Sequence, residues 1–299
     1  MIPSTLRPAR VGSVDSPAPS PALGRLGDLE VRLATGAREV RRAQRVRFKV
    51  FHEHGTARAA PEAALQRRDL CPYDAVCDHL VVVDHAAPDR RLGVRRPRIV
   101  GTYRLLRQDV ALRHGGFYTG GEFDLAPLLA RHPDKRFLEL GRACVLPRYR
   151  ARRAIELLWR GIWAYVRQHR IDVLIGCASF PGSAPEAHLD ALSALRHFAP
   201  AEPAWQAGPV AGRGCPTLLL PAHRLDRRAA LATLPPLVKG YLRAGARFSE
   251  AVVVDRTFDT VDVLAVMPLA ALDARYRSRL DAGLDLRAPA LPRGFDRAL

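Results

Sequence analysis

The tetrapeptide Glu139-Leu-Gly-Arg142 is the sharpest chemical signal in the sequence. On a regular strand the side chains at positions i and i+3 point to opposite faces. A β-bulge adds one residue and so brings both side chains to one face, and Gly141 would tolerate the backbone angles that many bulges require. A glutamate held in this way can act as a general base, and the N–H groups that a bulge frees can bind an oxyanion. A structural ion pair at a sheet edge would use the same residues, so the motif alone leaves both interpretations open.

A dense basic segment begins at the same motif. Between Arg142 and Arg170 it contains eight arginines, at positions 142, 148, 150, 152, 153, 160, 167 and 170. The middle group precedes the helix predicted over 154–166, where arginines and the free N–H groups of a helix start would form an anion site suited to a phosphate. The alternative is a solvated basic helix face.

Histidines and cysteines give no comparable signal. Their spacing matches no standard zinc finger or zincin, so we predict no metal site among His52, His54, Cys71, Cys77 and His79. Cys144 and Cys177 lie in predicted strands, where a thiol is usually a small core residue. The sequence also lacks a P-loop, a GxGxxG turn and a nucleophile-elbow serine.

Composition limits the class of protein. The 299 residues include 47 Lys and Arg against 30 Asp and Glu, a net charge of +17, and 44 of the basic residues are arginines. The hydrophobic fraction of 48% excludes a disordered chain. No apolar run reaches the roughly 18 residues of a spanning helix, which predicts a soluble protein. The charge suits a nucleic acid, an acidic protein or an anionic membrane surface, or reflects codon bias. Because no nucleic-acid module is recognisable and aromatic residues make up only 7%, we predict no nucleic-acid partner.

The chain ends and the cysteines indicate a cytoplasmic protein. Five cysteines do not suggest a disulfide framework, and the N-terminus lacks the apolar core of a secretory signal. We predict a disordered leader over residues 1–27, one domain over 28–283 and a tail over 284–299.

Hydrophobic periodicity predicts one α/β domain with a mixed sheet and a C-terminal elaboration. Predicted strands cover 29–34, 78–84, 98–106, 136–147, 171–180, 250–254 and 261–267. Predicted helices cover 38–51, 57–68, 154–166, 186–198, 237–244 and 269–280. The strand, helix and strand within 136–180 form a βαβ pattern, which predicts a parallel pair.

Several long strings in this order resemble one family. They are HLVVVD…IVGTYRLL, GGFYTGGEFDL, FLELGRACV…IELLWRGIWAYV, DVLIGCASFPG, LPPLVKGYL and DRTFDTVDVLAVMPL. They resemble the bacterial ornithine-lipid-forming N-acyltransferases, which are GNAT-like enzymes related to the acyl-homoserine lactone synthases. The similarity runs from about residue 29 to residue 280.

The resemblance implies a fold and a reaction. The fold is GNAT-like, with a central mixed, mostly antiparallel sheet flanked by helices. The reaction moves a 3-hydroxyacyl group from acyl carrier protein to the α-amino group of L-ornithine and gives a lyso-ornithine lipid. The donor is the phosphopantetheine thioester of the carrier protein, and no metal or other cofactor is implied. Acyl carrier protein and L-ornithine are the implied partners, and the basic charge would suit peripheral contact with the inner face of the cytoplasmic membrane.

The resemblance also implies site residues. Related synthases have an Arg-Tyr-x-x-Phe helix motif, paired aspartates, a GT-x-RL strand and a Glu-x-x-Arg strand. The corresponding positions here are Arg47 and Phe51, then Asp69 and Asp74 at a different spacing, then Arg104, and finally Glu139 and Arg142. We expect Glu139 to act as the base, while Arg104 and Arg142 hold it or orient the ornithine carboxylate.

The chain departs from typical GNAT enzymes at one loop. Where those enzymes have a glycine-containing loop that cradles the coenzyme A pyrophosphate, this chain has PRYRARRA. A carrier protein is acidic and its phosphopantetheine has one phosphate, and arginines suit both. We therefore predict that Arg148, Arg150, Arg152 and Arg153 dock the carrier protein. An apolar slot for the acyl chain is expected between the sheet and the helix that bears Trp159 and Trp163. The same two tryptophans would also be explained as ordinary core residues.

Three classes of alternative remain at this point. An N-acyltransferase acting on lysine, glutamine or glycine would share every feature described. An acyl-homoserine lactone synthase would release a lactone from S-adenosylmethionine. A basic membrane- or nucleic-acid-binding protein would show affinity without forming a product.

Overall fold

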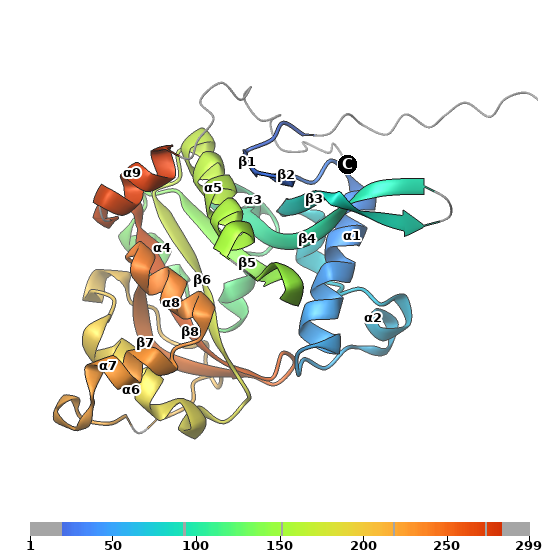
Figure 1. Cartoon of the computed structure of the whole chain (residues 1–299). Coiled ribbons are helices and arrows are strands. Elements are labelled where there is room, and N and C mark those ends of the chain that lie inside the picture. Colours follow the sequence, from blue (N-terminus) through green and yellow to red (C-terminus); the bar gives the residue numbers. More distant parts are fainter. Residues whose placement is uncertain (1–19, 92–93, 151, 218, 273, 283–299) are drawn as a thin grey trace, which may run out of the picture.

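The computed structural model describes residues 20–91, 94–150, 152–217, 219–272 and 274–282. In this part of the chain a single sheet runs through the molecule in the order β1-β2-β3-β4-β5-β6-β8-β7 (Figure 1). Its strands are β1 (Gly24–Leu26), β2 (Leu29–Leu33), β3 (Asp78–Arg91), β4 (Val94–Arg107), β5 (Phe137–Val145), β6 (Val173–Pro181), β7 (Arg247–Asp255) and β8 (Thr260–Pro268).

The pairing of these strands is antiparallel with one exception. Only β5 and β6 are parallel, and the helix that connects them makes the predicted βαβ unit. The predicted mixed, mostly antiparallel sheet is therefore confirmed.

Helices cover both faces of the sheet (Figure 1). They are α1 (Ala37–Phe48), α2 (Pro61–Gln66), α3 (Gln108–Arg113), α4 (Ala126–Arg131), α5 (Arg152–His169), α6 (Leu189–Phe198), α7 (Arg227–Thr233), α8 (Pro236–Ala244) and α9 (Ala274–Ala282). A π-helical turn, Lys49–Glu53, continues α1. None of the helices in the described ranges combines the length and apolar character needed to cross a bilayer.

Two apolar cores lie on opposite faces of the sheet. In β8, Val263 and Ala265 belong to the core beneath α5 and α8, whereas Leu264 and Val266 belong to the core beneath α3 and α4. This alternation follows from the two-residue period of a strand. The sheet is therefore buried on both sides, which explains why its central strands read as continuous apolar runs.

Two differences from the sequence prediction concern the edges of the fold. Strand β1 lies inside the segment predicted as a leader: it pairs with β2, and Leu23 is buried. Residues 1–19 and the predicted tail at 284–299 fall outside the described ranges. The segment between the strands predicted at 78–84 and 98–106 extends both of them as a hairpin, because β3 and β4 pair as far as Arg91 and Val94 (Figure 1).

The parallel pair separates beside the tetrapeptide motif. Pairing between β5 and β6 covers only Phe137 to Glu139 on one side and Val173 to Ile175 on the other. The next residue, Gly176, lies so close to β5 that an added Cβ would be 2.5 Å from the backbone oxygen of Leu140. A glycine is needed here because real Cβ atoms do not approach a backbone oxygen that closely.

We expect Gly176→Ala to lower the free energy of unfolding by about 1–3 kcal/mol, because the strands must move apart to admit the methyl group. Gly240→Ala in α8 is the matched control, since an added Cβ there meets nothing within 4 Å. Urea denaturation measures both variants. Equal stability of the two would show that the approach of β6 to Leu140 imposes no steric constraint.

Candidate active site

The Glu139–Arg142 motif lies on a β-bulge, as predicted. Thr102 pairs with Cys144 and Arg104 with Gly141, so two residues of β5, Arg142 and Ala143, face one residue of β4. The left-handed backbone conformation falls on Arg142, with φ 53°, and not on Gly141. For a residue with a side chain this conformation costs about 1 kcal/mol or more, and such strain is concentrated at functional sites.

Glu139 is the buried carboxylate of this bulge. Its side chain accepts a hydrogen bond from the backbone N–H of Thr119 at 3.2 Å, and the residue is only 2% exposed. Burial raises the pKa of Glu139 to about 7, against the opposing effects of Arg104, backbone N–H groups and Arg142. A carboxylate with a pKa near neutrality is suited to general base catalysis.

The predicted arginines and aspartates form one buried ionic network. Arg47 is fully buried; its Nε donates to Asp69 Oδ2 at 2.7 Å, and its two terminal nitrogens donate to Asp74 at 2.8 and 2.6 Å. Asp69 also pairs with Arg142 at 3.3 Å, and Asp74 with Arg104 at 3.4 Å. Burial alone would raise the pKa of both aspartates, but His52 and Arg47 lower that of Asp69, and Arg47 lowers that of Asp74. Asp69 and Asp74 therefore act as partners that position Arg142 and Arg104 at the site.

Both motif arginines retain buried donors for a ligand. One terminal nitrogen of Arg104, Nη2, is buried without a hydrogen-bond partner, and Arg142 Nε forms no hydrogen bond beyond its ion pair with Asp69. Two rings cover the guanidinium of Arg142, with centroids 4.6 Å away for Tyr118 and 4.2 Å for Phe258. Phe51 packs edge-on against Phe258 at 5.7 Å, so its contact with the site is indirect.

A cavity of about 380 Å³ opens beside the bulge. Its lining carries both signs of charge, with a cationic group of His52, Arg58, Arg142 and Arg213 and an acidic group of Asp69, Glu122 and Asp255. Tyr118 and Phe258 complete its aromatic wall. A cavity that holds both charges suits a small zwitterion such as an amino acid.

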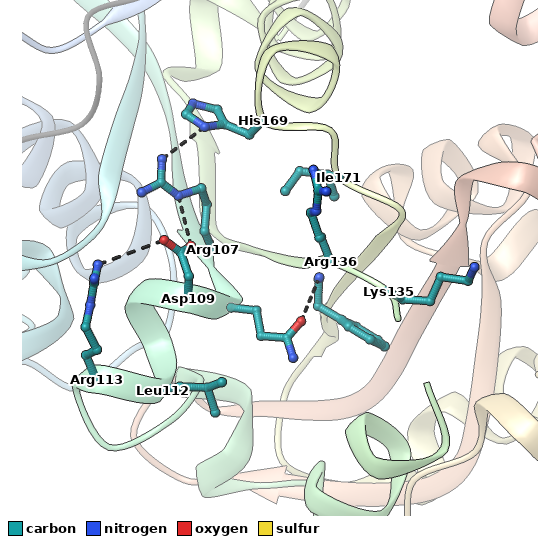
Figure 2. Close-up of a pocket in the computed structure, with 10 residues that line it drawn as sticks. Arg107, Asp109, Leu112, Arg113, Lys135, Arg136, His169 and Ile171 are labelled. Atoms are coloured by element: carbon teal, nitrogen blue, oxygen red, sulfur yellow. Dashed lines mark hydrogen bonds and ion pairs between the residues drawn. The ribbon is translucent and has the colours of Figure 1, made fainter. Parts of the chain in front are cut away.

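A second cavity, of about 720 Å³, lies at the start of β5 (Figure 2). It is basic, and Figure 2 shows Arg107 between His169 and Asp109, with Lys135 and Arg136 across the opening. None of the predicted site residues lines it. The smaller cavity beside Glu139 is therefore the better candidate for the reaction.

The predicted docking arginines lie on the surface beyond β5. Arg148, Arg150 and Arg153 are exposed, and Arg150 Nε donates to the carbonyl oxygen of Val145 at 3.3 Å. The side chain of Arg152 lies outside the described part of the structure. Because β5 and β6 are unpaired beyond Glu139, this basic group lies at the open end of the strand pair.

The predicted apolar slot is narrow. A cavity of about 20 Å³ lies between β5, β6, α5 and α8, and Trp159 and Tyr241 line it. Trp163 does not line it and donates to Asp281 Oδ1 at 2.9 Å instead. This volume holds about one water molecule, so an acyl chain would need the side chains around it to move.

The histidines and cysteines considered as zinc ligands do not come together. Within the described ranges, the one group of possible ligands close enough to share a metal is Glu122, Cys177 and Asp262. Sequence reasoning also missed Tyr118, Thr119 and Phe258. For Tyr118 and Thr119 the signal was the string GGFYTGGEFDL, whose glycines and aromatic residues do not match a helix or a strand, and Phe258 lies in a different string, DRTFDTVDVLAVMPL.

Comparisons with known proteins show the family of the chain. Residues 46–160 match the model of the acetyltransferase (GNAT) domain family. The chain is 51% identical over 255 residues to an L-ornithine N(alpha)-acyltransferase of Agrobacterium fabrum, covering 85% of this chain and 86% of the relative. It is 50% identical over 266 residues to the enzyme of that name from Rhizobium meliloti, covering 88% of each chain.

Among solved structures, the chain is similar to FeeM, an N-acyl amino acid synthase from uncultured soil microbes. The identity is 11%, the TM-score is 0.44, and 84% of this chain and 93% of that one are covered. The acyl-homoserine lactone synthase LasI gives 12% identity and a TM-score of 0.44, and 86% of this chain and 96% of LasI are covered. The long, highly identical alignments to the curated relatives decide the assignment. The chain is an acyltransferase with a GNAT fold, and it belongs to the L-ornithine N(alpha)-acyltransferase family.

Proposed function

We propose that this protein transfers a 3-hydroxyacyl group from the phosphopantetheine thioester of acyl carrier protein to the α-amino group of L-ornithine. The product is a lyso-ornithine lipid, which makes this the first step of ornithine lipid formation. The supporting observation is that Glu139, a buried carboxylate with a pKa of about 7, is bonded by the backbone N–H of Thr119, and that the neighbouring Tyr118 and the motif residue Arg142 line a cavity with both signs of charge, as an amino acid requires.

The proposed mechanism is direct transfer in a ternary complex. Glu139, directly or through water, takes a proton from the α-ammonium group. The free amine then attacks the thioester carbon, and N–H groups at the bulge stabilise the tetrahedral oxyanion. The C–S bond breaks and the amide forms as the attacking nitrogen gives up its second proton, which protonates the departing pantetheine thiolate. No covalent acyl-enzyme is required.

The two motif arginines receive different roles in this proposal. Arg142 lines the cavity, and its Nε forms no hydrogen bond beyond the ion pair with Asp69, so its guanidinium would bind the carboxylate of ornithine. Arg104 does not line the cavity and is the strongest cationic influence on Glu139, so it would stabilise the ionised base. A guanidinium is suited to the first role because its planar fork matches a carboxylate.

The test is a product assay with purified full-length protein and 3-hydroxyacyl carrier protein. Ornithine, lysine, glutamine, glycine and S-adenosylmethionine are offered separately, and the product is read by mass spectrometry. We expect an amide of ornithine. If the main product is an acyl-lysine, acyl-glutamine or acyl-glycine, the acceptor is that amino acid and not ornithine. A lactone would indicate the acyl-homoserine lactone synthase alternative. The absence of any product would contradict an enzymatic function.

Charge reversal of Arg148, Arg150 and Arg153 to glutamate is expected to raise the KM for acyl carrier protein by about tenfold or more. The salt dependence of kcat/KM should also flatten, because exposed charges steer an acidic partner to its site. Steady-state kinetics at two ionic strengths measure both effects.

The control reverses three exposed arginines elsewhere on the surface: Arg224, Arg228 and Arg243. This variant has the same net charge, so it separates a local docking surface from the field of the whole protein. If both triple variants behave alike, or if only the KM for ornithine changes, the docking assignment is wrong.

We also propose that the enzyme works in the cytoplasm, with peripheral contact at the anionic inner face of the membrane. The support is the net charge of +17 and the amphiphilic character of the proposed product.

A further inference from the structure

A cluster of acidic groups lies behind the cavity and has no role in the mechanism above. The ligand atoms of Glu122, Cys177 and Asp262 all lie within 4.8 Å of one another. Glu122 follows the turn Tyr118–Gly121, Cys177 lies on β6 and Asp262 on β8. The two carboxylates are 5% and 3% exposed. Three separate elements thus bring two carboxyl groups together in the interior.

The cluster lacks a cation. In the described ranges neither carboxylate forms an ion pair with an arginine, a lysine or a histidine. The groups that act on them are each other and Asp255, which are acidic, and the neutral Cys177, Ser179 and Thr260. Asp262 Oδ1 is buried without a hydrogen-bond partner.

Unpaired buried carboxylates are costly, so they favour keeping a proton. Burial and mutual repulsion raise the pKa of Glu122 to about 8 and also raise the pKa of Asp262. A cation between the two carboxylates would relieve both the repulsion and the missing hydrogen bond. A substrate that carries its own cation would supply it at the moment of binding.

The cluster is connected to the reaction centre through one residue. The backbone N–H of Thr119 bonds Glu139, and its hydroxyl lies 3.7 Å from Cys177 Sγ. That sulfur lies 3.4 Å from Glu122 Oε2, and Glu122 lines the same cavity as Arg142. The cavity therefore has Arg142 and the acidic Glu122 in its wall, and Thr119 links the cluster behind Glu122 to the buried base Glu139.

We propose that Glu122 and Asp262 bind the side-chain ammonium group of the acceptor, so that the site selects an α-amino acid whose side chain ends in a primary amine. This inference rests on the proposed function, because it assumes that the acceptor occupies the cavity beside Glu139. Arg142 takes the carboxylate, Glu139 takes a proton from the α-ammonium, and the acidic pair holds the second ammonium away from the thioester. The pair thereby also directs acylation to the α-nitrogen.

The experiment compares L-ornithine with L-norvaline, which has the same carbon chain without the terminal amine. Acyl transfer is measured for the full-length wild type, Glu122→Gln and Asp262→Asn. In each variant we expect the ratio of kcat/KM for ornithine to that for norvaline to fall by about 10- to 100-fold, the usual effect of losing a charged hydrogen bond. Calorimetry without an acyl donor should show the same loss of ornithine binding.

Two controls keep the result interpretable. Glu62→Gln makes the same substitution at an exposed carboxylate on α2 and should leave the ratio unchanged. Both cluster variants should fold, because each removes the repulsion between two buried acidic groups, and a thermal melt checks this. If one of them does not fold, the other still decides the result.

Three outcomes would overturn the inference. The first is a parallel loss for both acceptors, which would indicate a structural role. The second is a wild-type enzyme that transfers the acyl group but prefers norvaline or does not discriminate between norvaline and ornithine. The third is wild-type selectivity that disappears with EDTA and returns with Zn²⁺, which would make the cluster a metal site. Failure of the proposed function is distinguishable, because the wild type would then acylate neither acceptor.

Discussion

Glu139→Gln is expected to lower kcat for acyl transfer by about 10²- to 10⁴-fold, which corresponds to about 3–5 kcal/mol of activation free energy. The amide keeps the size of the side chain and its hydrogen bond from Thr119, but it cannot accept a proton from the α-ammonium group. Glu156→Gln on α5 is the matched control, because that carboxylate pairs with Arg160 in the same helix and away from the cavity.

The pH profile gives the same prediction an independent signature. Since the pKa of Glu139 is raised to about 7, the ionised base is present above that value and is lost as the pH falls through it. In the wild type, kcat should therefore fall about tenfold per pH unit well below pH 7. Glu139→Gln should lack this limb. Wild-type turnover by the variant, or an unchanged limb, would remove Glu139 from the mechanism.

Arg47→Met is expected to lower the free energy of unfolding by about 3–5 kcal/mol at neutral pH. Methionine fills much of the same volume, but Asp69 and Asp74 then lose the fork that bonds both of them. Urea denaturation measures the loss. The stability of Arg47→Lys should lie between that of the wild type and that of Arg47→Met, because one ammonium group cannot reproduce the three hydrogen bonds to the aspartate side chains.

The sign of the pH effect follows from the lowered pKa of each aspartate. Their contribution to wild-type stability is present above the unfolded pKa and is lost as the pH falls through the lower folded value. The deficit of Arg47→Met should thus shrink as the pH is lowered toward about 4, where the unpaired carboxylates take up protons. If the free energy of unfolding of Arg47→Met is less than about 1 kcal/mol below that of the wild type at neutral pH, other groups replace Arg47 as partners of the two aspartates.

Periodicity was sufficient to predict the centre of this fold, because the relevant interactions there are local. The apolar stripe of α5 and the strands on either side of it gave the βαβ unit, which the parallel pairing of β5 and β6 confirms. The edges were less predictable. Strand β1 has three residues, and its stability comes from pairing with β2, which no local pattern records.

The candidate site divides in the same way. The bulge could be predicted because Glu139, Gly141 and Arg142 are neighbours in sequence. The cavity could not, because Glu122 and Phe258 reach it from segments more than a hundred residues apart. Asp69 and Asp74 illustrate a further limit: a resemblance places them in the site, but only the three-dimensional contacts show that they are bonded to arginines.

At position 142 the backbone and the side chain favour different residues. A glycine there would adopt the left-handed conformation freely, whereas arginine holds it under strain. The arginine side chain is nevertheless paired with the buried Asp69 and covered by Tyr118 and Phe258, and Arg142→Gly would remove all three contacts. A library screened only for heat tolerance should therefore keep Arg142 although a glycine suits the backbone better, and it would thereby preserve the proposed carboxylate-binding side chain.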